Sequence, residues 1–168
     1  MKNVLITGGA GFVGRHMCKR FSGMDYQVFC VDNLISESAK ELENWPEHLK
    51  CTKNFTFINK DCREYFKNEG KDMKFNLVIH LAAVVGGRAV IENSPIAVAE
   101  DLSIDAEMFN WAVKAKPDKL VFFSSSAAYP IKYQKDDSNK KHLSEDMITF
   151  ESDIGMADLT YGWAKLTG

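Results

Sequence analysis

The architecture of the chain follows from residues 4–14, which read VLITGGAGFVG. A short apolar run ends in glycines and an amphipathic pattern begins directly behind them, which predicts a buried strand, a tight turn and a helix. Gly9, Gly11 and Gly14 have the spacing G-x-G-x-x-G, and Gly8 begins an overlapping G-x-x-G-x-x-G. Glycines in such a turn let a diphosphate approach the backbone and the first N–H groups of the helix. Taken alone, a glycine turn after a strand can also be a simple turn that binds nothing, so the residues around it decide between the two interpretations.

The residues that follow the turn favour a dinucleotide site. Val13, Met17 and Phe21 recur four apart, as on one face of a helix. Tyr26–Val31 then reads as a second strand, and Asp32 follows it, 18 residues beyond the last glycine of the turn. In a dinucleotide-binding fold an acid at this place accepts hydrogen bonds from the ribose hydroxyls. Its charge repels a 2′-phosphate, so the sequence predicts NAD rather than NADP.

Composition narrows the function classes. The chain has 168 residues, 45% hydrophobic and 26% charged, with a formal net charge of −2. These values are ordinary for a globular protein, and they give no basic footprint for nucleic acid. No apolar run is long enough for a membrane span and no signal peptide is visible, so we expect a cytoplasmic protein with no membrane partner. Cys18, Cys30, Cys51 and Cys62 form no C-x-x-C pair, which favours free thiols and no metal site.

Strands alternate with helices along the rest of the chain. Further strands are predicted over Phe55–Ile58, Phe75–Leu81 and Lys119–Phe123, and a long helix over Pro95–Ala115. A short helix is possible over Ser38–Asn44. This alternation predicts an α/β fold, a Rossmann-type doubly wound parallel sheet.

The long helix carries an apolar repeat. The positions expected to form its apolar face are Ala99, Leu102, Ala106, Phe109 and Val113. We interpret Met108, Phe109 and Trp111 as core or subunit contacts rather than as a ligand site.

Several polar or small residues follow the predicted strands, where ligands bind in such sheets. Asp61 could accept from the adenine amine while the Cys62 backbone donates to the ring, although a helix N-cap by Asp61 explains the same residue equally well. Ala82 and Ala83 let the backbone approach a cofactor. Arg88 could meet a substrate phosphate, but a solvated arginine is the favoured interpretation.

The last predicted helix carries Tyr161 and Lys165, four residues apart and therefore on one face. A lysine cation beside a phenol favours the phenolate, which can act as a general base. The lysine can also bind the hydroxyls of the nicotinamide ribose. This spacing is common by chance, so the pair gains its meaning from the dinucleotide turn and from the serines at 124–126.

Together these motifs resemble the amino-terminal part of an extended short-chain dehydrogenase/reductase, of the NAD-dependent nucleotide-sugar epimerase/dehydratase family. The matching residues are Thr7–Gly14, Asp32–Leu34, Asp61, His80–Ala83, Ser124, Ser125, Tyr129, Tyr161 and Lys165. The resemblance implies that the cofactor is bound by Gly8, Gly11, Phe12, Val13, Gly14, Asp32, Asn33, Asp61, Cys62, Leu81, Ala82, Ala83, Tyr161 and Lys165. It implies that Ser125, Tyr161 and Lys165 are catalytic, with Ser126 in place of Ser125 if the loop aligns with a gap.

The resemblance also implies a reaction. Tyr161 takes a proton from a sugar hydroxyl that Ser125 holds, hydride passes to the nicotinamide, and an epimerase returns it to the other face of the keto-sugar. Family dehydratases and decarboxylases usually have an acid just after the catalytic Ser or Thr, where this chain has Ser126 and Ala127. Residues 84–87 and Tyr129-Pro130 are similar to the GDP-sugar branch, whose 3,5-epimerase has a cysteine at the place of Ala127. A 4-epimerase or a keto-sugar reductase therefore fits best.

Family members continue well beyond the Tyr/Lys helix into a smaller domain that binds the nucleotide-sugar. We therefore expect residues 1–168 to be an incomplete NAD-binding Rossmann domain without the substrate domain. The expected partners are a nucleotide-sugar, with a GDP-sugar among the choices, and a second copy of the chain in a homodimer. A truncated NAD-binding module without turnover is the alternative from another functional class.

Overall fold

A computed structural model describes residues 1–36, 39, 52–70, 73–85, 93–134, 142–148 and 157–168. The possible helix at Ser38–Asn44 and the interpretation of Arg88 lie outside the described residues. The chain forms two compact units, described separately below. The first comprises Met1–Ala83 and Ala106–Phe123, and the second comprises Val84–Asp105 and Ser124–Gly168.

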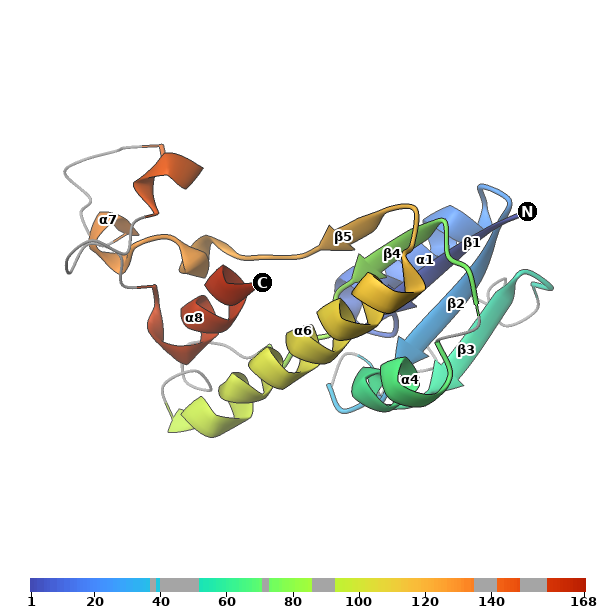
Figure 1. Ribbon diagram of the computed structural model, residues 1–168, viewed down its shortest axis with the longest axis horizontal. Coiled ribbons are helices and arrows are strands. Elements are labelled where there is room, and N and C mark those ends of the chain that lie inside the picture. The colour runs from blue at the N-terminus through green and yellow to red at the C-terminus, as the bar shows by residue number, and fades with distance from the viewer. Residues whose placement is uncertain (37–38, 40–51, 71–72, 86–92, 135–141, 149–156) are drawn as a thin grey trace. The chain divides into compact units, whose positions relative to one another are not determined.

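The first unit contains a parallel five-stranded sheet (Figure 1). Its strands are β1 (Lys2–Thr7), β2 (Tyr26–Asp32), β3 (Phe55–Asn59), β4 (Leu77–His80) and β5 (Leu120–Phe122). Their order in the sheet is β3-β2-β1-β4-β5, and every neighbouring pair is parallel. This order reverses direction at β1, as in a doubly wound nucleotide-binding sheet. The predicted fold class is therefore confirmed.

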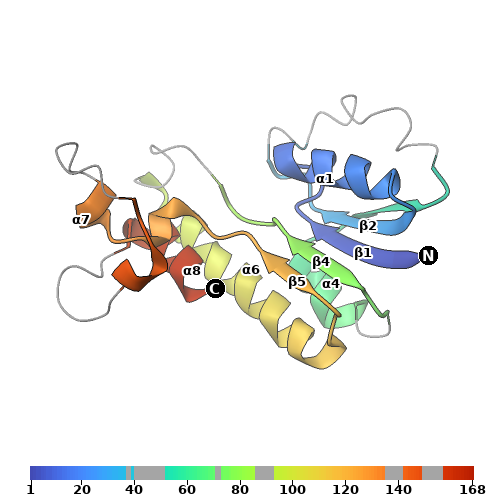
Figure 2. The same ribbon diagram turned by 90° about the horizontal axis from the view of Figure 1, so that it is seen from above.

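Helices cover both faces of this sheet. Helix α1 (Phe12–Ser22) lies on one face, and α4 (Cys62–Asn68) lies on the other (Figure 2). Residues 106–115 of α6 (Pro95–Ala115) contact α4 through the rings of Phe66 and Trp111, whose centroids are 5.0 Å apart. In the described part of the chain, helices thus connect β1 to β2, β3 to β4 and β4 to β5.

The face under α1 has an aliphatic core. Val4 and Ile6 of β1, Val28 and Cys30 of β2, and Cys18 of α1 are all fully buried there. Burial raises the pKa of the Cys30 thiol well above its usual value, so this thiol is held in its neutral form.

The three apolar residues predicted to share one face of α1 differ in their burial. Met17 and Phe21 pack partly buried against this aliphatic core, but Val13 is 43% exposed. Val13 lies in the first turn of the helix, directly after the glycine turn.

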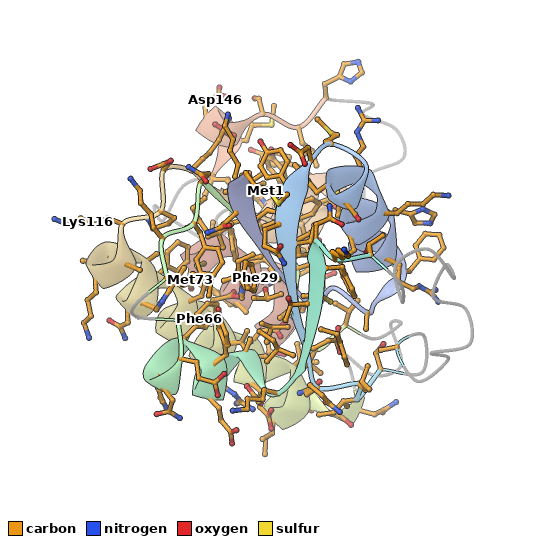
Figure 3. All side chains as sticks on the ribbon, turned by 90° about the vertical axis from the view of Figure 1, so that its right-hand side faces the viewer. Met1, Phe29, Phe66, Met73, Lys116 and Asp146 are labelled. Atoms are coloured by element: carbon orange, nitrogen blue, oxygen red, sulfur yellow. The ribbon has the colours of Figure 1, made fainter. Side chains whose placement is uncertain are left out.

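The opposite face has an aromatic core, to which β2 contributes Phe29, the residue between Val28 and Cys30. The rings of Phe29 and Phe75 meet edge to face with their centroids 5.5 Å apart, and the centroids of the Phe75 and Trp111 rings are 6.0 Å apart. The Nε1–H of Trp111 donates to the carbonyl oxygen of Gly70 at 2.8 Å, so its polar atom is satisfied inside the core. Figure 3 shows Phe29 and Phe66 on this side of the sheet.

The apolar repeat predicted for α6 was wrong. Leu102 and Val113, expected on its buried face, are 41% and 74% exposed. The residues of α6 that are buried instead are Val98, Asp101, Ile104, Asp105, Met108 and Trp111. The prediction failed because two of the inward positions carry aspartates, which a search for apolar residues passes over. The interpretation of Met108 and Trp111 as core residues is confirmed.

The second unit is built around α8 (Leu159–Thr167) and the short 3-10 helix η2 (Ser126–Ala128). It also contains the first part of α6, α7 (Ile131–Gln134) and the 3-10 helix η3 (Glu145–Met147). Ala128 is 5% exposed and Ala164 is fully buried, so small side chains fill the space where η2 meets α8.

The contact between β1 and α1 depends on missing side chains. A Cβ added at Gly14 would lie 2.2 Å from the carbonyl oxygen of Gly8 and 2.5 Å from the Cα of Gly9. A Cβ added at Gly9 would lie 2.4 Å from the sulfur of Cys30. Helix α1 therefore starts directly over the end of the strand, where no larger residue fits.

We expect Gly14→Ala to lower the free energy of unfolding by about 2 kcal/mol or more, because backbone atoms would have to move apart. Alanine is otherwise the better helix former, so a rise in stability would contradict the packing argument. Gly23→Ala is the matched control at the other end of α1, since its Cβ would meet nothing closer than the Arg20 carbonyl oxygen at 3.5 Å. Urea denaturation of the two variants beside the wild type measures the effect.

Candidate functional site

The glycine turn connects three strands of the first unit. Gly8 has a φ of +66°, which favours glycine, and its N–H donates to the carbonyl oxygen of Val31 at 2.9 Å. A Cβ at Gly8 would lie 2.7 Å from the backbone nitrogen of Ala82. The turn thus lies against the end of β2 and against the residues that follow β4.

Gly11 has a different environment from the other glycines of the turn. As the N-cap of α1 it provides no side-chain cap, and a Cβ there would meet only the Gly8 carbonyl oxygen, at 3.3 Å. The first N–H groups of a helix have no partner within the helix, and its amino end carries a partial positive charge. An anion such as the diphosphate of a dinucleotide fits this cradle, which a side chain at Gly11 would narrow.

Asp32 supports the turn from the end of β2. One carboxylate oxygen accepts the Ala10 N–H at 2.9 Å and the other accepts the Leu34 N–H at 2.8 Å, and the residue is 9% exposed. Each oxygen has a second lone pair, so the carboxylate can still accept from a ribose. The neighbouring Asn33 side chain accepts the Ile35 N–H at 3.3 Å.

Asp61 serves as the N-cap of α4. Its carboxylate accepts the Arg63 N–H at 2.8 Å and forms an ion pair with the Arg63 guanidinium at 2.6 Å. The Arg63 side chain holds the pKa of Asp61 below its usual value. The capping interpretation is therefore present in the structure, and the adenine contact stays a prediction. Burial raises the pKa of the Cys62 thiol to about 12, so this thiol is held in its neutral form.

The residues after β4 are held by Thr7. The Leu81 N–H donates to the Thr7 carbonyl oxygen at 3.1 Å, and the Thr7 hydroxyl lies 2.7 Å from Nδ1 of His80. Thr7 is fully buried and His80 is 1% exposed, which fits a structural histidine. The backbone of Leu81 and Ala82 thus lies against Gly8 of the turn, and the approach of Leu81, Ala82 and Ala83 to a cofactor stays a prediction.

In the second unit the serine segment is held against the last helix. The Ala127 carbonyl oxygen accepts the Asp158 N–H at 3.0 Å, and a Cβ at Gly162 would lie 2.3 Å from that same oxygen. The Ser124 hydroxyl donates to the Lys165 carbonyl oxygen at 3.0 Å. The Ser125 hydroxyl accepts the Ala127 N–H at 3.2 Å as the cap of η2.

These contacts bring the predicted catalytic residues into one unit. Tyr161 and Lys165 lie on α8, and Ser125 begins the short helix that packs against it. Tyr161 is partly buried, whereas Lys165 is only 4% exposed. The cofactor residues of the glycine turn lie in the other unit, so the structure assembles each group within its own unit.

Lys165 has buried acidic neighbours that the sequence reasoning missed. Its Nζ lies 3.5 Å from Oδ2 of Asp105, and Asp101 lies one helical turn earlier on α6. Oδ1 of Asp101 accepts the Val84 N–H at 2.5 Å. Burial raises the pKa of Asp101 from 3.8 to about 6, although the Val84 N–H and Lys165 act in the opposite direction. Two aspartates at helical spacing within the apolar repeat were the signal that could have revealed them.

The comparisons with known proteins identify the family. The model of the NAD dependent epimerase/dehydratase family matches residues 4–152. This chain belongs to that family. The same residues that carry the resemblance in the sequence thus lie within the matched part, except Tyr161 and Lys165, which follow it.

Relatives of known and unknown activity share this family. An uncharacterised protein of Methanocaldococcus jannaschii is 32% identical over 93% of this chain and 51% of its own length. The UDP-glucose 4-epimerase of Bacillus subtilis is 30% identical over 76% of this chain and 38% of its own length. A UDP-N-acetyl-alpha-D-glucosaminuronate decarboxylase of Bacillus cytotoxicus is 27% identical over 76% of this chain and 38% of its own length.

The solved structures agree on the fold. The UDP-glucuronic acid 4-epimerase of Bacillus cereus, solved with NAD, has a TM-score of 0.76 at 23% identity. This chain is covered to 98% in that comparison, and the epimerase to 49%. The chain thus spans about half the length of such relatives, or less.

Two further observations concern the described residues alone. No group of three or more His, Cys, Asp or Glu side chains among them could hold a metal ion. None of the helices in the described part of the chain is long and apolar enough to cross a membrane.

Asp101→Asn is expected to change how stability depends on pH. The folded wild type keeps the Asp101 proton up to about pH 6, whereas the unfolded chain releases it near pH 3.8, so this group favours folding at low pH. That contribution is lost as the pH rises through both values, and asparagine does not lose it. Relative to the wild type, the variant should gain about 2 kcal/mol between pH 4 and pH 7.5.

Urea denaturation of both proteins across that pH range measures the difference in their free energies of unfolding. The contributions of the other titrating groups are the same in both proteins and cancel in this difference. The asparagine can still accept the Val84 N–H through its oxygen, so it keeps the hydrogen bond of Oδ1. A difference between the two proteins that stays constant with pH would contradict the raised pKa.

Proposed function

We propose that this chain is the NAD-binding portion of a nucleotide-sugar 4-epimerase, with residues 1–168 acting as one cofactor domain. The observation that carries the proposal is the uncapped amino end of α1, held beside the Asp32 carboxylate by the Ala10 N–H. An anion cradle next to a buried acid at the end of β2 is the arrangement that a dinucleotide requires. The family is NAD-dependent, which supports the same cofactor here.

The cofactor contacts follow from the placement of these residues. Phe12 and Val13 would hold the diphosphate through backbone N–H groups of the first turn of α1, and Gly8, Gly11 and Gly14 would leave room for it. The Gly8 and Gly11 N–H groups themselves donate to the carbonyl oxygens of Val31 and Gly8. The residues expected to bind the remaining parts of NAD are Asp32 and Asn33 at the adenosine ribose, Asp61 and Cys62 at the adenine, Leu81, Ala82 and Ala83 along the turn, and Tyr161 and Lys165 at the nicotinamide ribose. Asp61 would accept a hydrogen bond from the adenine amine while it keeps its ion pair with Arg63.

The catalytic proposal rests on the second unit. Bound NAD supplies the acceptor that takes a hydride from the sugar and gives it back. Ser125 would hold the sugar hydroxyl, and Tyr161 would take its proton and later return it. The contacts of Ala127 with Asp158 and Gly162 support this pairing, because they hold the serine segment against the helix of Tyr161.

A UDP-sugar is the substrate class that the relatives favour. The Bacillus subtilis relative is named as a UDP-glucose 4-epimerase, and that chain is 30% identical. Decarboxylation, the activity in the name of another relative, is disfavoured because Ser126 and Ala127 give no acid after Ser125. A GDP-sugar is the second candidate substrate class, because residues 84–87 and Tyr129-Pro130 are similar to the GDP-sugar branch. The alanine at position 127, in place of a cysteine, disfavours 3,5-epimerisation. Homodimerisation stays a prediction.

We expect the wild-type chain to bind NAD at least about 100-fold more tightly than NADP, because the Asp32 carboxylate faces the ribose hydroxyls and repels a 2′-phosphate. Asp32→Ala should weaken NAD binding about ten-fold or more, as expected for the loss of hydrogen bonds to a charged group. It should also reduce the preference for NAD over NADP. Isothermal titration with each dinucleotide gives both values.

The ratio of the two affinities is the informative quantity, because damage to the turn alone would weaken both dinucleotides together. Such damage is expected to some degree, since Asp32 also accepts from Ala10 and Leu34. An unchanged ratio in Asp32→Ala would remove Asp32 from the ribose.

Incubated with NAD and UDP-glucose, the chain is expected to form a transient keto-sugar, seen as absorption by reduced nicotinamide, and then UDP-galactose, seen in the proton NMR spectrum. Tyr161→Phe should lower the rate about 100-fold or more, because it removes the general base and leaves the ring in place. A wild type that binds NAD and forms no keto-sugar would instead act as an NAD-binding module without turnover, the second candidate function.

A further inference from the structure

Three charged side chains from two helices are buried together in the second unit. Asp101 and Asp105 come from α6 and Lys165 comes from α8. Asp101 is fully buried, while Asp105 and Lys165 are each 4% exposed. Charged residues are almost never buried to this degree unless they are paired.

The two aspartates make different contacts. Oδ2 of Asp105 lies 3.5 Å from Nζ of Lys165, so these two form an ion pair away from water. Oδ1 of Asp101 accepts the N–H of Val84, four residues after the end of β4, and its Oδ2 has no hydrogen-bond partner among the described residues. Two carboxylates one turn apart on α6 thereby connect Lys165 with the segment at Val84.

Burial makes this connection matter for the lysine. Low dielectric surroundings disfavour the charged form of a lysine that has no counter-ion. A nearby carboxylate reverses that effect, and its fixed place on a helix limits where the ammonium can lie. The charged groups that act on Asp101 itself are Lys165 from α8 and Asp105 and Glu100 from α6, together with the Val84 N–H.

We propose that Asp105 and Asp101 are positioning residues for Lys165. Asp105 keeps the Lys165 ammonium charged and in place, and Asp101 fixes the segment at Val84 to the same side of α6. This inference rests on the proposed function, in which Lys165 binds the nicotinamide ribose.

The first test compares Asp105→Asn, Lys165→Met and the wild type in NAD titrations between about pH 6.5 and pH 8.5. Lys165→Met should bind NAD at least ten-fold more weakly at every pH. Asp105→Asn should bind nearly as well as the wild type at low pH and approach Lys165→Met as the pH rises, because its buried lysine loses its proton. Asp101→Asn should show a smaller loss of affinity.

Glu107→Gln is the matched control. Glu107 is also a carboxylate of α6 paired with a lysine, at 3.2 Å from Lys67, but the side chains of this pair are 29% and 57% exposed. Its substitution should leave NAD affinity unchanged across the pH range. A loss in Asp105→Asn that does not vary with pH would show a structural role only and would overturn the proposal.

A second readout does not depend on NAD. In protein labelled with ¹³C at the lysine ε-carbon, the Lys165 signal is the one absent from Lys165→Met. In the wild type this signal should keep its ammonium shift to a higher pH than in Asp105→Asn. Equal titration in the two proteins would contradict the positioning role.

A double-mutant cycle covers the case in which Asp105→Asn folds poorly. If Asp105 stabilises the protein through Lys165, the double variant Asp105→Asn/Lys165→Met should be more stable to urea than Asp105→Asn alone. Additive losses would overturn the inference. If Lys165→Met binds NAD like the wild type, the proposed role of Lys165 fails, and this outcome is distinct from a failure of Asp105 to act on it.

Discussion

The close approach of backbone atoms within residues 8–14 is the constraint on which the first unit depends. Gly8, Gly9 and Gly14 each lie where a Cβ would come within 2.7 Å of a backbone atom or a thiol. Because these positions are bare, α1 begins at once over the end of β1, and its amino end stays next to Asp32. Ala10 can then donate to the Asp32 carboxylate at 2.9 Å. The glycines that allow the close backbone contacts and the proposed diphosphate cradle thus belong to one turn. Gly11 differs from the other three, because a Cβ there would come no closer than 3.3 Å to another atom.

The second unit uses the same device in a different place. Gly162 lies where a Cβ would come 2.3 Å from the Ala127 carbonyl oxygen, and Asp158 donates to that oxygen. Here the close approach joins a 3-10 turn to a helix rather than a strand to a helix. Its effect is to fix the spacing between the Ser125 segment and the residues of α8. The proposed roles of Ser125 and Tyr161, which would act on one sugar hydroxyl from separate segments, would need this fixed spacing.

The sequence predicted the parallel sheet well because its strands are short apolar runs that end in recognisable residues. The bounds of α6 were predicted from Pro95 to Ala115 and agree with the structure, yet its buried face was not. The buried face of α6 combines Val98 and Met108 with two aspartates. A search for hydrophobic periodicity counts only apolar residues, so it does not detect a buried acid. Asp61 shows a different limit. Capping and adenine binding require the same residue at the same place, so sequence alone could not separate them, and the Arg63 ion pair became visible only in three dimensions.

The cost of burying Lys165 argues that this cluster serves binding rather than stability. Replacing a buried ion pair with apolar residues of similar size is often neutral or stabilising, because desolvation offsets much of the attraction between the charges. The cluster in the second unit is costlier than a simple pair, since it buries a second carboxylate, Asp101, besides the ion pair of Asp105 with Lys165, and burial raises the pKa of Asp101 to about 6. A methionine at position 165 and apolar residues on α6 would fill the same space at lower cost. Strongly perturbed titratable groups of this kind gather at functional sites. The buried ion pair of Lys165 and Asp105 on the helix of Tyr161 therefore agrees with the proposed role of Lys165 toward the hydroxyl groups of a ligand.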